Sequence, residues 1–281
     1  MMSEAPLRVV QLGCGIFSRE GQGPAWKEMI RQGRVTMVVC WSRSEESARE
    51  MCAYYDEVQG SIKVEAIWGE ETWMGLLQRE DIDAVTILLP IHLLARYSKA
   101  ALEAGKHVLS EKPIAGNMEE ARSMVEFYQA RRKEHPSQLY CIAENYRFEY
   151  AFRRSMQLLG EGTLLGRPFM VELTAHVPHL LGSKYEKTQW RREAKHLGGI
   201  ITDSSVHFMA GLRLLMNSEV ECLSSFTSKH AAHLPKVDTL VASLRFCNGT
   251  SGSAAITFAA TSRLFEYRVR CERGILMMIR G

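Results

Sequence analysis

The chain has 281 residues, of which 46% are hydrophobic and 24% charged, a balance typical of a globular protein with a full hydrophobic core. Its formal net charge of +3 is too small to indicate binding to nucleic acid or to an anionic membrane surface. No apolar run approaches the roughly 20 residues of a membrane-spanning helix, and the N-terminus lacks the layout of a signal peptide. Seven scattered cysteines without Cys-x-x-Cys spacing predict no disulfide framework and no metal site, which favours a reducing compartment, the cytoplasm.

A predicted strand, Leu7–Leu12, runs directly into a glycine-rich turn. Gly13 and Gly15 match the first two glycines of a dinucleotide-binding fingerprint, which allow a tight turn and a close approach of a pyrophosphate to the backbone. A helix beginning near Phe17 would direct its N–H groups at that phosphate. The third position is Ser18 rather than Gly or Ala, so the match is imperfect and a plain β-turn is the alternative interpretation.

The end of the second predicted strand, Val35–Trp41, bears on the choice of cofactor. An NAD-selective site places Asp or Glu there to bind the ribose hydroxyls, whereas a nearby Arg suits the 2′-phosphate of NADP. Ser42 and Arg43 stand at this strand end and no acid precedes them, which favours NADP(H) over NAD(H). A solvated loop arginine is the alternative. Ser44 is a natural N-cap for the next predicted helix, Glu45–Tyr55.

Strands and helices continue to alternate through the first half of the chain. The further predicted strands are Ile62–Trp68, Ala84–Leu89, His107–Ser110 and Leu139–Ala143. The further predicted helices are Glu71–Arg79, Leu93–Ala104 and Asn117–Arg132. Apolar strands separated by helices of this length predict right-handed βαβ units and a doubly wound parallel sheet, that is, an α/β Rossmann domain.

The short segment Glu111-Lys112-Pro113 ends one of these strands. Proline has no N–H to donate and biases the preceding residue away from helix, so Lys112 stands on a stiff corner at the carboxyl end of a parallel strand. Ligands bind at that edge of open α/β sheets. Pro90 ends its own strand at the same edge, and His92 follows it. A surface lysine before a turn and an ordinary loop histidine are the alternatives.

The pattern changes after residue 144, and we predict domains over residues 1–144 and 145–281. The second holds predicted helices over Ala151–Leu159 and Val206–Met216, with strands over Gly166–His176, Val220–Phe226, Thr239–Phe246, Ser253–Ala260, Phe265–Cys271 and Gly274–Ile279. Asn248-Gly249 is a tight hairpin turn between two of the strands. Strands joined by turns predict an α+β domain with a mostly antiparallel open sheet.

Asp203 and His207 are four residues apart and therefore lie on one face of a helix that begins about there. One interpretation is structural: Asp203 or Thr202 caps the helix and His207 packs among apolar neighbours. The functional interpretation is that His207 exchanges a proton with a substrate hydroxyl, with the aspartate one turn away to orient or charge it.

Taken together, these motifs resemble the glucose–fructose oxidoreductase / inositol dehydrogenase / MocA (Gfo/Idh/MocA) family of NAD(P)-dependent oxidoreductases, and within it a branch of fungal and plant NADP-linked enzymes. The matching residues follow the family order over about residues 7–281. They are Gly13-x-Gly15, Pro90, Glu111-Lys112-Pro113, Asn145-x-Arg147, Gly160 with Leu165-Gly166, Trp190-Arg191, Gly198-Gly199 and Asp203-x-x-x-His207. The proline of Glu-Lys-Pro is cis in some relatives.

The resemblance implies a Rossmann domain beside an α+β domain whose open sheet often forms a dimer face. Lys112 would bridge the nicotinamide ribose and the substrate oxygen, while Asp203 and His207 would line the substrate site, with His207 as acid/base. The residues predicted to bind the cofactor are Gly13, Gly15, Ile16, Phe17, Ser42, Arg43, Leu89, Pro90, His92, Glu111 and Lys112. Asn145, Arg147, Trp190 and Arg191 are predicted to bind the substrate, and specificity is predicted to lie in loops such as residues 177–192.

Three positions depart from the family pattern: Ser18 in the glycine loop, Ser205 in place of the glycine of Asp-x-Gly-x-His, and Leu94 where many relatives carry His. Relatives also continue past a strand like Gly274–Ile279 with further strands and a closing helix, so the chain is expected either to be C-terminally truncated or to manage without that closing helix.

The leading hypothesis is an NADP(H)-dependent oxidoreductase that transfers hydride to or from a sugar, polyol or small carbonyl substrate and forms a homo-oligomer through its C-terminal sheet. A non-catalytic NADP(H)-binding regulator or scaffold is the alternative. A structural subunit that binds no dinucleotide ranks last, because it requires Gly13–Ser18 to be a mere turn.

Overall fold

The computed structural model describes residues 5–160, 164–179, 182, 184–185 and 187–280. Its contacts divide the chain into two compact units, Met1–Ala143 and Glu144–Gly281. The border places Glu144 in the second unit, immediately after the last strand of the first.

The first unit is built on a sheet in the order β3-β2-β1-β4-β5-β6, and each neighbouring pair of strands runs parallel. The strands are β1 (Leu7–Leu12), β2 (Val35–Ser42), β3 (Glu65–Trp68), β4 (Ala84–Ile87), β5 (His107–Ser110) and β6 (Tyr140–Ile142). This is the strand order of a Rossmann domain, with the switch of direction between β1 and β4. The predicted doubly wound sheet is confirmed.

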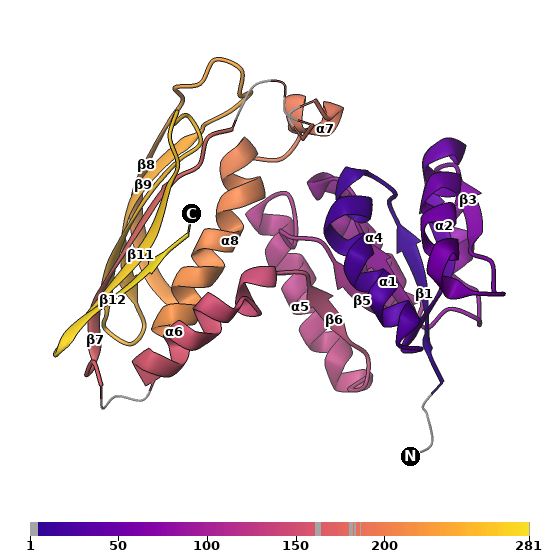
Figure 1. Cartoon of the computed structure of the whole chain (residues 1–281), viewed down its shortest axis with the longest axis horizontal. Helices are drawn as coiled ribbons and strands as arrows, with labels where there is room; N and C mark the ends of the chain where they lie inside the picture. The colour runs from indigo at the N-terminus through magenta and orange to yellow at the C-terminus, as the bar shows by residue number, and fades with distance from the viewer. Residues whose placement is uncertain (1–4, 161–163, 180–181, 183, 186, 281) are drawn as a thin grey trace. The chain divides into compact units, whose positions relative to one another are not determined.

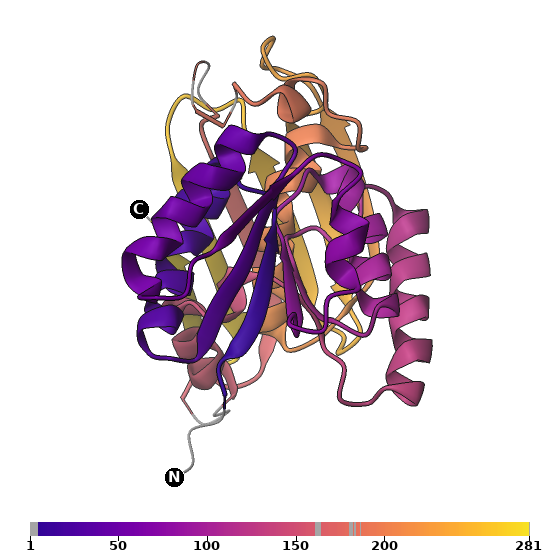
Figure 2. The same cartoon turned by 90° about the vertical axis from the view of Figure 1, so that its right-hand side faces the viewer.

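The helices of the first unit flank this sheet (Figure 2). They are the π-helical turn η1 (Ser18–Gln22), then α1 (Gly23–Arg31), α2 (Glu45–Gln59), α3 (Trp73–Leu77), α4 (Ile91–Glu103) and α5 (Met118–Glu134). Side chains of α1 and α2 share one buried cluster with the sheet, and side chains of α3, α4 and α5 share another. The strands are therefore covered on both faces, which explains why their sequences are mostly apolar rather than alternating.

The strand β3 begins at Glu65, three residues later than the predicted Ile62. Side chains of α2 hold the preceding segment out of the sheet: the Gln59 amide donates to the carbonyl of Ile62 at 3.2 Å, and Asp56 accepts from the backbone N–H of Val64 at 3.0 Å. Backbone groups engaged by side chains are not available to a strand ladder, so the strand is shorter than its apolar pattern suggests.

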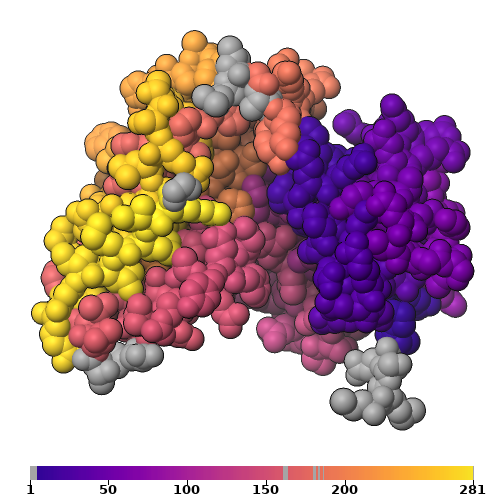
Figure 3. Space-filling view, viewed as in Figure 1, coloured from indigo at the N-terminus to yellow at the C-terminus, as the bar shows by residue number. Residues whose placement is uncertain are grey.

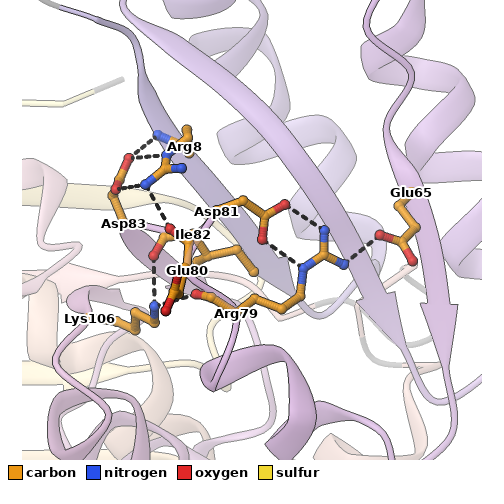
Figure 4. A network of polar contacts seen from close by, with 8 residues as sticks. All are labelled: Arg8, Glu65, Arg79, Glu80, Asp81, Ile82, Asp83 and Lys106. Atoms are coloured by element: carbon orange, nitrogen blue, oxygen red, sulfur yellow. Dashed lines mark hydrogen bonds and ion pairs between the residues drawn. The ribbon is translucent and has the colours of Figure 1, made fainter.

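A charged cluster ties down the amino end of β4 (Figure 4). The Arg8 side chain and backbone N–H donate to the carboxylate of Asp83 at 2.7–3.0 Å. Lys106 donates to the carbonyls of Arg79 and Ile82 at 2.6 and 2.8 Å. The Arg8 guanidinium keeps the pKa of the Asp83 carboxyl below its ordinary value by hydrogen bonding. These contacts fix the end of the sheet opposite the edge where the glycine loop lies.

The second unit is built on a sheet in the order β12-β11-β7-β10-β9-β8. The strands are β7 (Pro168–His176), β8 (Val220–Ser228), β9 (Thr239–Phe246), β10 (Ser251–Thr257), β11 (Leu264–Cys271) and β12 (Gly274–Ile279). Neighbours run antiparallel except β10 and β7, which are parallel. The predicted α+β domain with a mostly antiparallel sheet is confirmed, and Gly249 has the positive φ, 83°, that the predicted hairpin turn requires.

Helices cover one face of this sheet (Figure 1). They are α6 (Tyr150–Gly160) and α8 (Gly199–Met216), accompanied by the 3-10 turn η2 (Asn145–Arg147) and the short α7 (Gln189–Arg192). The core between helices and sheet is rich in aromatic rings, with Phe152, Phe246, Phe265 and Tyr267 at most 1% exposed. Among the residues that the structure describes, none of the helices has the length and hydrophobicity of a membrane span.

Helix α8 begins at Gly199, seven residues before the predicted start at Val206. Gly198 and Gly199 adopt positive φ values of 78° and 51°, and the carbonyl of Gly198 accepts from the N–H of Ile201 at 3.0 Å. Glycine adopts this geometry without strain, so the glycine pair turns the chain straight into the helix. Asp203 is therefore inside the helix, and the interpretation of Thr202 or Asp203 as its N-cap is wrong.

The outward face of the second sheet carries exposed apolar side chains. Strands β11 and β12, which are yellow in Figure 3, lie at one edge of this sheet. The exposed apolar residues on this face are Phe226, Val241, Leu264, Ile275, Met277 and Ile279. Ion pairs of Arg270 with Glu172 and of Arg268 with Glu266 lie among them. The face is thus neither purely polar nor purely apolar.

Candidate active site

The glycine loop of the first unit packs against the end of β4. The backbone of Gly13 has φ +104° and donates its N–H to the carbonyl of Trp41 at 2.9 Å. A Cβ atom at this position would lie 2.3 Å from the carbonyl oxygen of Leu88. A Cβ at Gly15, in contrast, would meet nothing within 4 Å, so the loop presents an open backbone there. Gly13 serves the fold, and Gly15 leaves the space that a close-lying pyrophosphate needs.

Ser18, the departure in the glycine fingerprint, braces this loop. Its hydroxyl donates to the carbonyl of Gly13 at 2.9 Å, and the same carbonyl accepts from the Gln11 amide at 3.0 Å. Tyr55 in turn donates its hydroxyl to Gln11 at 2.7 Å. The serine is buried, so its hydroxyl fixes the loop rather than facing a ligand. The loop keeps a defined shape with Ser at the third position.

The end of β2 offers a free cation. Arg43 is exposed and makes no hydrogen bond or ion pair with any described residue. Ser42 is half-buried at the end of the strand. Ser44 is the N-cap of α2 as predicted, although its hydroxyl contacts Ser47 at 2.9 Å rather than a backbone N–H. Strand β2 is the neighbour of β1, which leads into the glycine loop. A guanidinium at the end of β2 is therefore suited to bind a phosphate group of the cofactor.

The remaining residues predicted to bind the cofactor follow β4 and β5. Leu89 and Pro90 are half-buried after β4, Pro90 is the N-cap of α4, and His92 is in its first turn. Glu111 accepts from the Gln22 side chain at 2.6 Å, and the Lys112–Pro113 peptide bond is cis.

Other residues near this edge of the sheet belong to helices. Ile16 and Phe17 open the helical segment that follows the glycine loop, and Phe17 is 44% exposed. Leu94, where many relatives carry His, is fully buried in the core. The carboxyl ends of β1, β2, β4 and β5 thus gather the predicted cofactor residues at one edge of the sheet.

In the second unit, Glu144 holds His207. Both carboxylate oxygens lie within hydrogen-bond distance of His207 Nδ1, at 2.8 and 2.9 Å. The Tyr146 ring stacks on the imidazole with centroids 5.1 Å apart, and its backbone N–H donates to Glu144 at 3.1 Å. Burial raises the pKa of the Tyr146 phenol, which therefore stays neutral at neutral pH. With Nδ1–H donating to the carboxylate, Nε2 carries the lone pair of the neutral ring.

Asp203 has a different partner. Arg191 Nε donates to its Oδ2 at 3.0 Å, and the guanidinium also lies 4.1 Å from the centroid of the Trp190 ring. The carboxylate is buried, with only 7% of its side chain exposed. Asp203 and His207 share a helix face, as the spacing predicts, but the expectation that Asp203 orients His207 is corrected: Glu144, 63 residues away in the sequence, orients the imidazole.

The other predicted substrate residues divide between these two groups. Trp190 and Arg191 join Asp203, whereas Asn145 and Arg147 lie exposed on η2 next to Glu144. The Asn145 side chain donates to Glu149 at 3.3 Å. Sequence reasoning missed Glu144 as a site residue. The signal that pointed to it was a carboxylate placed directly after the last Rossmann strand and directly before the Asn145-x-Arg147 motif.

A pocket lies at the start of α8, beside α7. The pocket is open to solvent, and the space between its lining atoms, including that solvent, is about 390 Å³. Its polar lining residues are His179, Arg191, Arg192, His196, Asp203 and His233. The predicted specificity loop, residues 177–192, contributes to it, although residues 180–181, 183 and 186 lie outside the described part of the chain. The substitution at Ser205 places a buried hydroxyl on α8 that has no hydrogen-bond partner among the described residues.

Comparison with known proteins matches both units to one family. Residues 7–135 match the model of the oxidoreductase family with an NAD-binding Rossmann fold, and residues 152–277 match the GFO/IDH/MocA C-terminal domain. Dehydrogenase FPY6 of Fusarium mangiferae is 32% identical, over 96% of this chain and 76% of its own. D-xylose 1-dehydrogenase [NADP(+)] of Haloarcula marismortui is 29% identical over 77% of this chain and 56% of its own.

A solved structure shows the same fold. An oxidoreductase from Thermotoga maritima superposes with a TM-score of 0.85 at 28% identity, covering 98% of this chain and 79% of that one. The family models together span nearly all of the chain, and the Fusarium relative extends over most of it. The protein is therefore an oxidoreductase of the Gfo/Idh/MocA family, with an NAD-binding Rossmann domain followed by the family's C-terminal domain.

Proposed function

We propose that this protein is an NADP(H)-dependent oxidoreductase that transfers hydride between the nicotinamide and a hydroxyl-bearing carbon of a sugar, a polyol or a small carbonyl compound. The observation that carries the proposal is the hydrogen-bonded Glu144–His207 pair, in which a buried carboxylate fixes one imidazole nitrogen and leaves the other as a base. A proton acceptor held in one tautomer is what alcohol oxidation requires of the protein.

The nicotinamide accepts or supplies the hydride when it is bound, and the protein's residues manage the proton. In the oxidation direction, His207 Nε2 accepts the hydroxyl proton as the carbinol carbon loses hydride, and Glu144 stabilises the imidazolium that forms. In the reduction direction the same nitrogen returns the proton to the carbonyl oxygen. Lys112, by resemblance to the family, stabilises negative charge that develops on that oxygen.

The cofactor preference follows from Arg43, which has no partner among the described residues and stands where a ribose-binding acid is absent. Arg43→Asp should weaken NADPH binding by about tenfold or more, because a charge-assisted contact to phosphate becomes a repulsion. It should leave NADH binding equal or tighter. Fluorescence titration of both reduced cofactors measures this, with Arg49→Asp on the neighbouring helix as the control. Equal losses for both cofactors would contradict the role of Arg43.

The substrate class is proposed from the pocket of the second unit, whose six polar side chains suit a ligand with several hydroxyl groups. The name of the Haloarcula relative, a D-xylose dehydrogenase, agrees with this class. Because all the cysteines are free thiols, we also propose that the protein works in the cytoplasm. Binding of NADPH without turnover on any sugar, polyol or aldehyde would instead favour the non-catalytic regulator.

We further propose that two copies pair through the outward face of the second sheet. Phe226 is 83% exposed and lies opposite Val241, which is 53% exposed, on neighbouring strands. Phe226→Glu should convert a dimer into a monomer, since an apolar side chain buried in an interface can contribute on the order of 2 kcal/mol, which the charged substitution removes. Sedimentation velocity over a dilution series measures this, with Ile62→Glu on the first unit as the control. A dimer that survives Phe226→Glu places the interface elsewhere.

A further inference from the structure

The His196 imidazole lines the pocket of the second unit with one nitrogen satisfied and the other not. The ring is 4% exposed, and its Nε2 lies 3.1 Å from the carbonyl oxygen of Gly199. A carbonyl oxygen only accepts hydrogen bonds, so Nε2 carries the hydrogen. The Nδ1 atom is buried and has no hydrogen-bond partner among the described residues. A neutral imidazole with this tautomer presents Nδ1 as an unused acceptor.

The surroundings keep this ring neutral and fixed. Burial lowers the pKa of His196, so that the imidazole carries no charge at neutral pH. Lys236 Nζ donates to the backbone carbonyl of His196 at 2.8 Å, and the Trp190 ring packs beside the imidazole with centroids 6.2 Å apart. A buried acceptor without a partner destabilises the folded protein unless a ligand or an ordered water supplies a donor.

The same pocket holds the Arg191–Asp203 pair, whose carboxylate accepts and whose guanidinium donates. A hydroxyl group can both donate and accept, so one ligand with neighbouring hydroxyls can serve His196 and this pair together. An ionised carboxylate or phosphate oxygen carries no hydrogen to donate. Its lone pairs would repel the lone pair of Nδ1. The chemistry of the pocket therefore discriminates between hydroxyl and anionic groups at this position.

We propose that His196 is a specificity-determining residue: its Nδ1 accepts a hydrogen bond from a hydroxyl group of a polyhydroxylated substrate bound in this pocket. This inference rests on the proposed oxidoreductase function and requires its substrate to carry a hydroxyl group at the position that meets Nδ1. It assigns the His196 position to recognition, while the proton transfer stays with His207. Neither the anionic end of a sugar acid nor a sugar phosphate fits against this nitrogen.

The first test measures the ¹⁵N chemical shift of His196 Nδ1. In protein labelled with ¹⁵N-histidine and saturated with NADPH, His196→Gln identifies the Nδ1 resonance by its loss. Adding D-xylose or myo-inositol should move this resonance upfield, as it does when an unprotonated imidazole nitrogen accepts a hydrogen bond. An unchanged resonance at saturating concentrations of a sugar panel overturns the proposal. The Nδ1 resonance could instead lie in the hydrogen-bonded range before sugar is added and stay there afterwards. Water would then be the donor, and this result also overturns the proposal.

The second test compares each sugar that is turned over with its monodeoxy analogues. Glutamine can keep a donor near the Gly199 carbonyl but places no acceptor at Nδ1, so His196→Gln should fold and bind NADPH as the native chain does. The variant should raise KM by about three- to tenfold for the parent sugar, the effect of one hydrogen bond, with kcat nearly unchanged. It should have no effect on the analogue that lacks the recognised hydroxyl. His230→Gln, on an exposed histidine outside the pocket, is the control.

The two proposals fail in different ways. Absence of turnover with every sugar and both cofactors counts against the oxidoreductase function, and the ¹⁵N measurement then still decides whether His196 binds a hydroxyl. Turnover with equal losses for the parent sugar and all its deoxy analogues leaves the oxidoreductase standing and overturns the role of His196.

Discussion

His207→Ala should lower kcat by about 10²- to 10⁴-fold, the range that a positioned general base contributes. The substitution removes the only proposed proton acceptor of the second unit, while NADPH binding, which we assign to the first unit, should stay unchanged. Steady-state kinetics on a responsive sugar and fluorescence titration with NADPH measure the two quantities. Added imidazole should restore part of the activity, because it can occupy the space of the lost ring.

Glu144→Gln is the companion variant. Glutamine keeps the size of the side chain but loses the negative charge that stabilises an imidazolium at Nδ1. We expect kcat to fall by about tenfold or more, with KM for the sugar nearly unchanged, since Glu144 acts through His207 rather than on the substrate. Native rates in both variants would contradict the dyad. A loss confined to KM would make the pair a binding element instead.

Gly13→Ala should be the most destabilising change in the cofactor loop. The residue has φ +104°, and the added Cβ would lie 2.3 Å from a backbone oxygen, that of Leu88, which cannot rotate away. Positive φ strain and a backbone clash together predict a loss of about 3 kcal/mol or more in the free energy of unfolding. Urea denaturation measures this. A stability within experimental error of the native chain would show that the loop is not built as described.

Gly15→Ala is the matched variant two residues away. A Cβ there meets nothing within 4 Å, so the free energy of unfolding should change little. The methyl group should instead obstruct the approach of a pyrophosphate to the backbone and weaken NADPH binding by about tenfold or more. A loss of stability in Gly13→Ala together with a loss of NADPH affinity in Gly15→Ala would show that the loop has two separate roles, one in folding and one in cofactor binding. Native NADPH affinity in Gly15→Ala would remove this loop from the cofactor site.

The sequence predicted most of the fold because fold-level signals are local. Runs such as Ala84–Ile87 are mostly apolar and are buried on both faces, and they alternate with helices long enough to cross over between parallel strands. Element ends were predicted less well where side chains or glycines intervene. The late start of β3 depends on Gln59 and Asp56, and the early start of α8 depends on the backbone of Gly198 and Gly199.

Local patterns were enough to predict the family, the Rossmann and α+β architecture, and a set of candidate residues at strand and helix ends. Which of these residues act together depends on how distant segments pack in the fold. The spacing pairs Asp203 with His207 because residues four apart share a helix face. In the fold, however, Asp203 accepts a hydrogen bond from Arg191, and His207 is hydrogen-bonded to Glu144. A hydrogen bond joining residues 63 positions apart, and a buried nitrogen such as Nδ1 of His196, depend on how segments pack, and no local pattern of side chains encodes that packing.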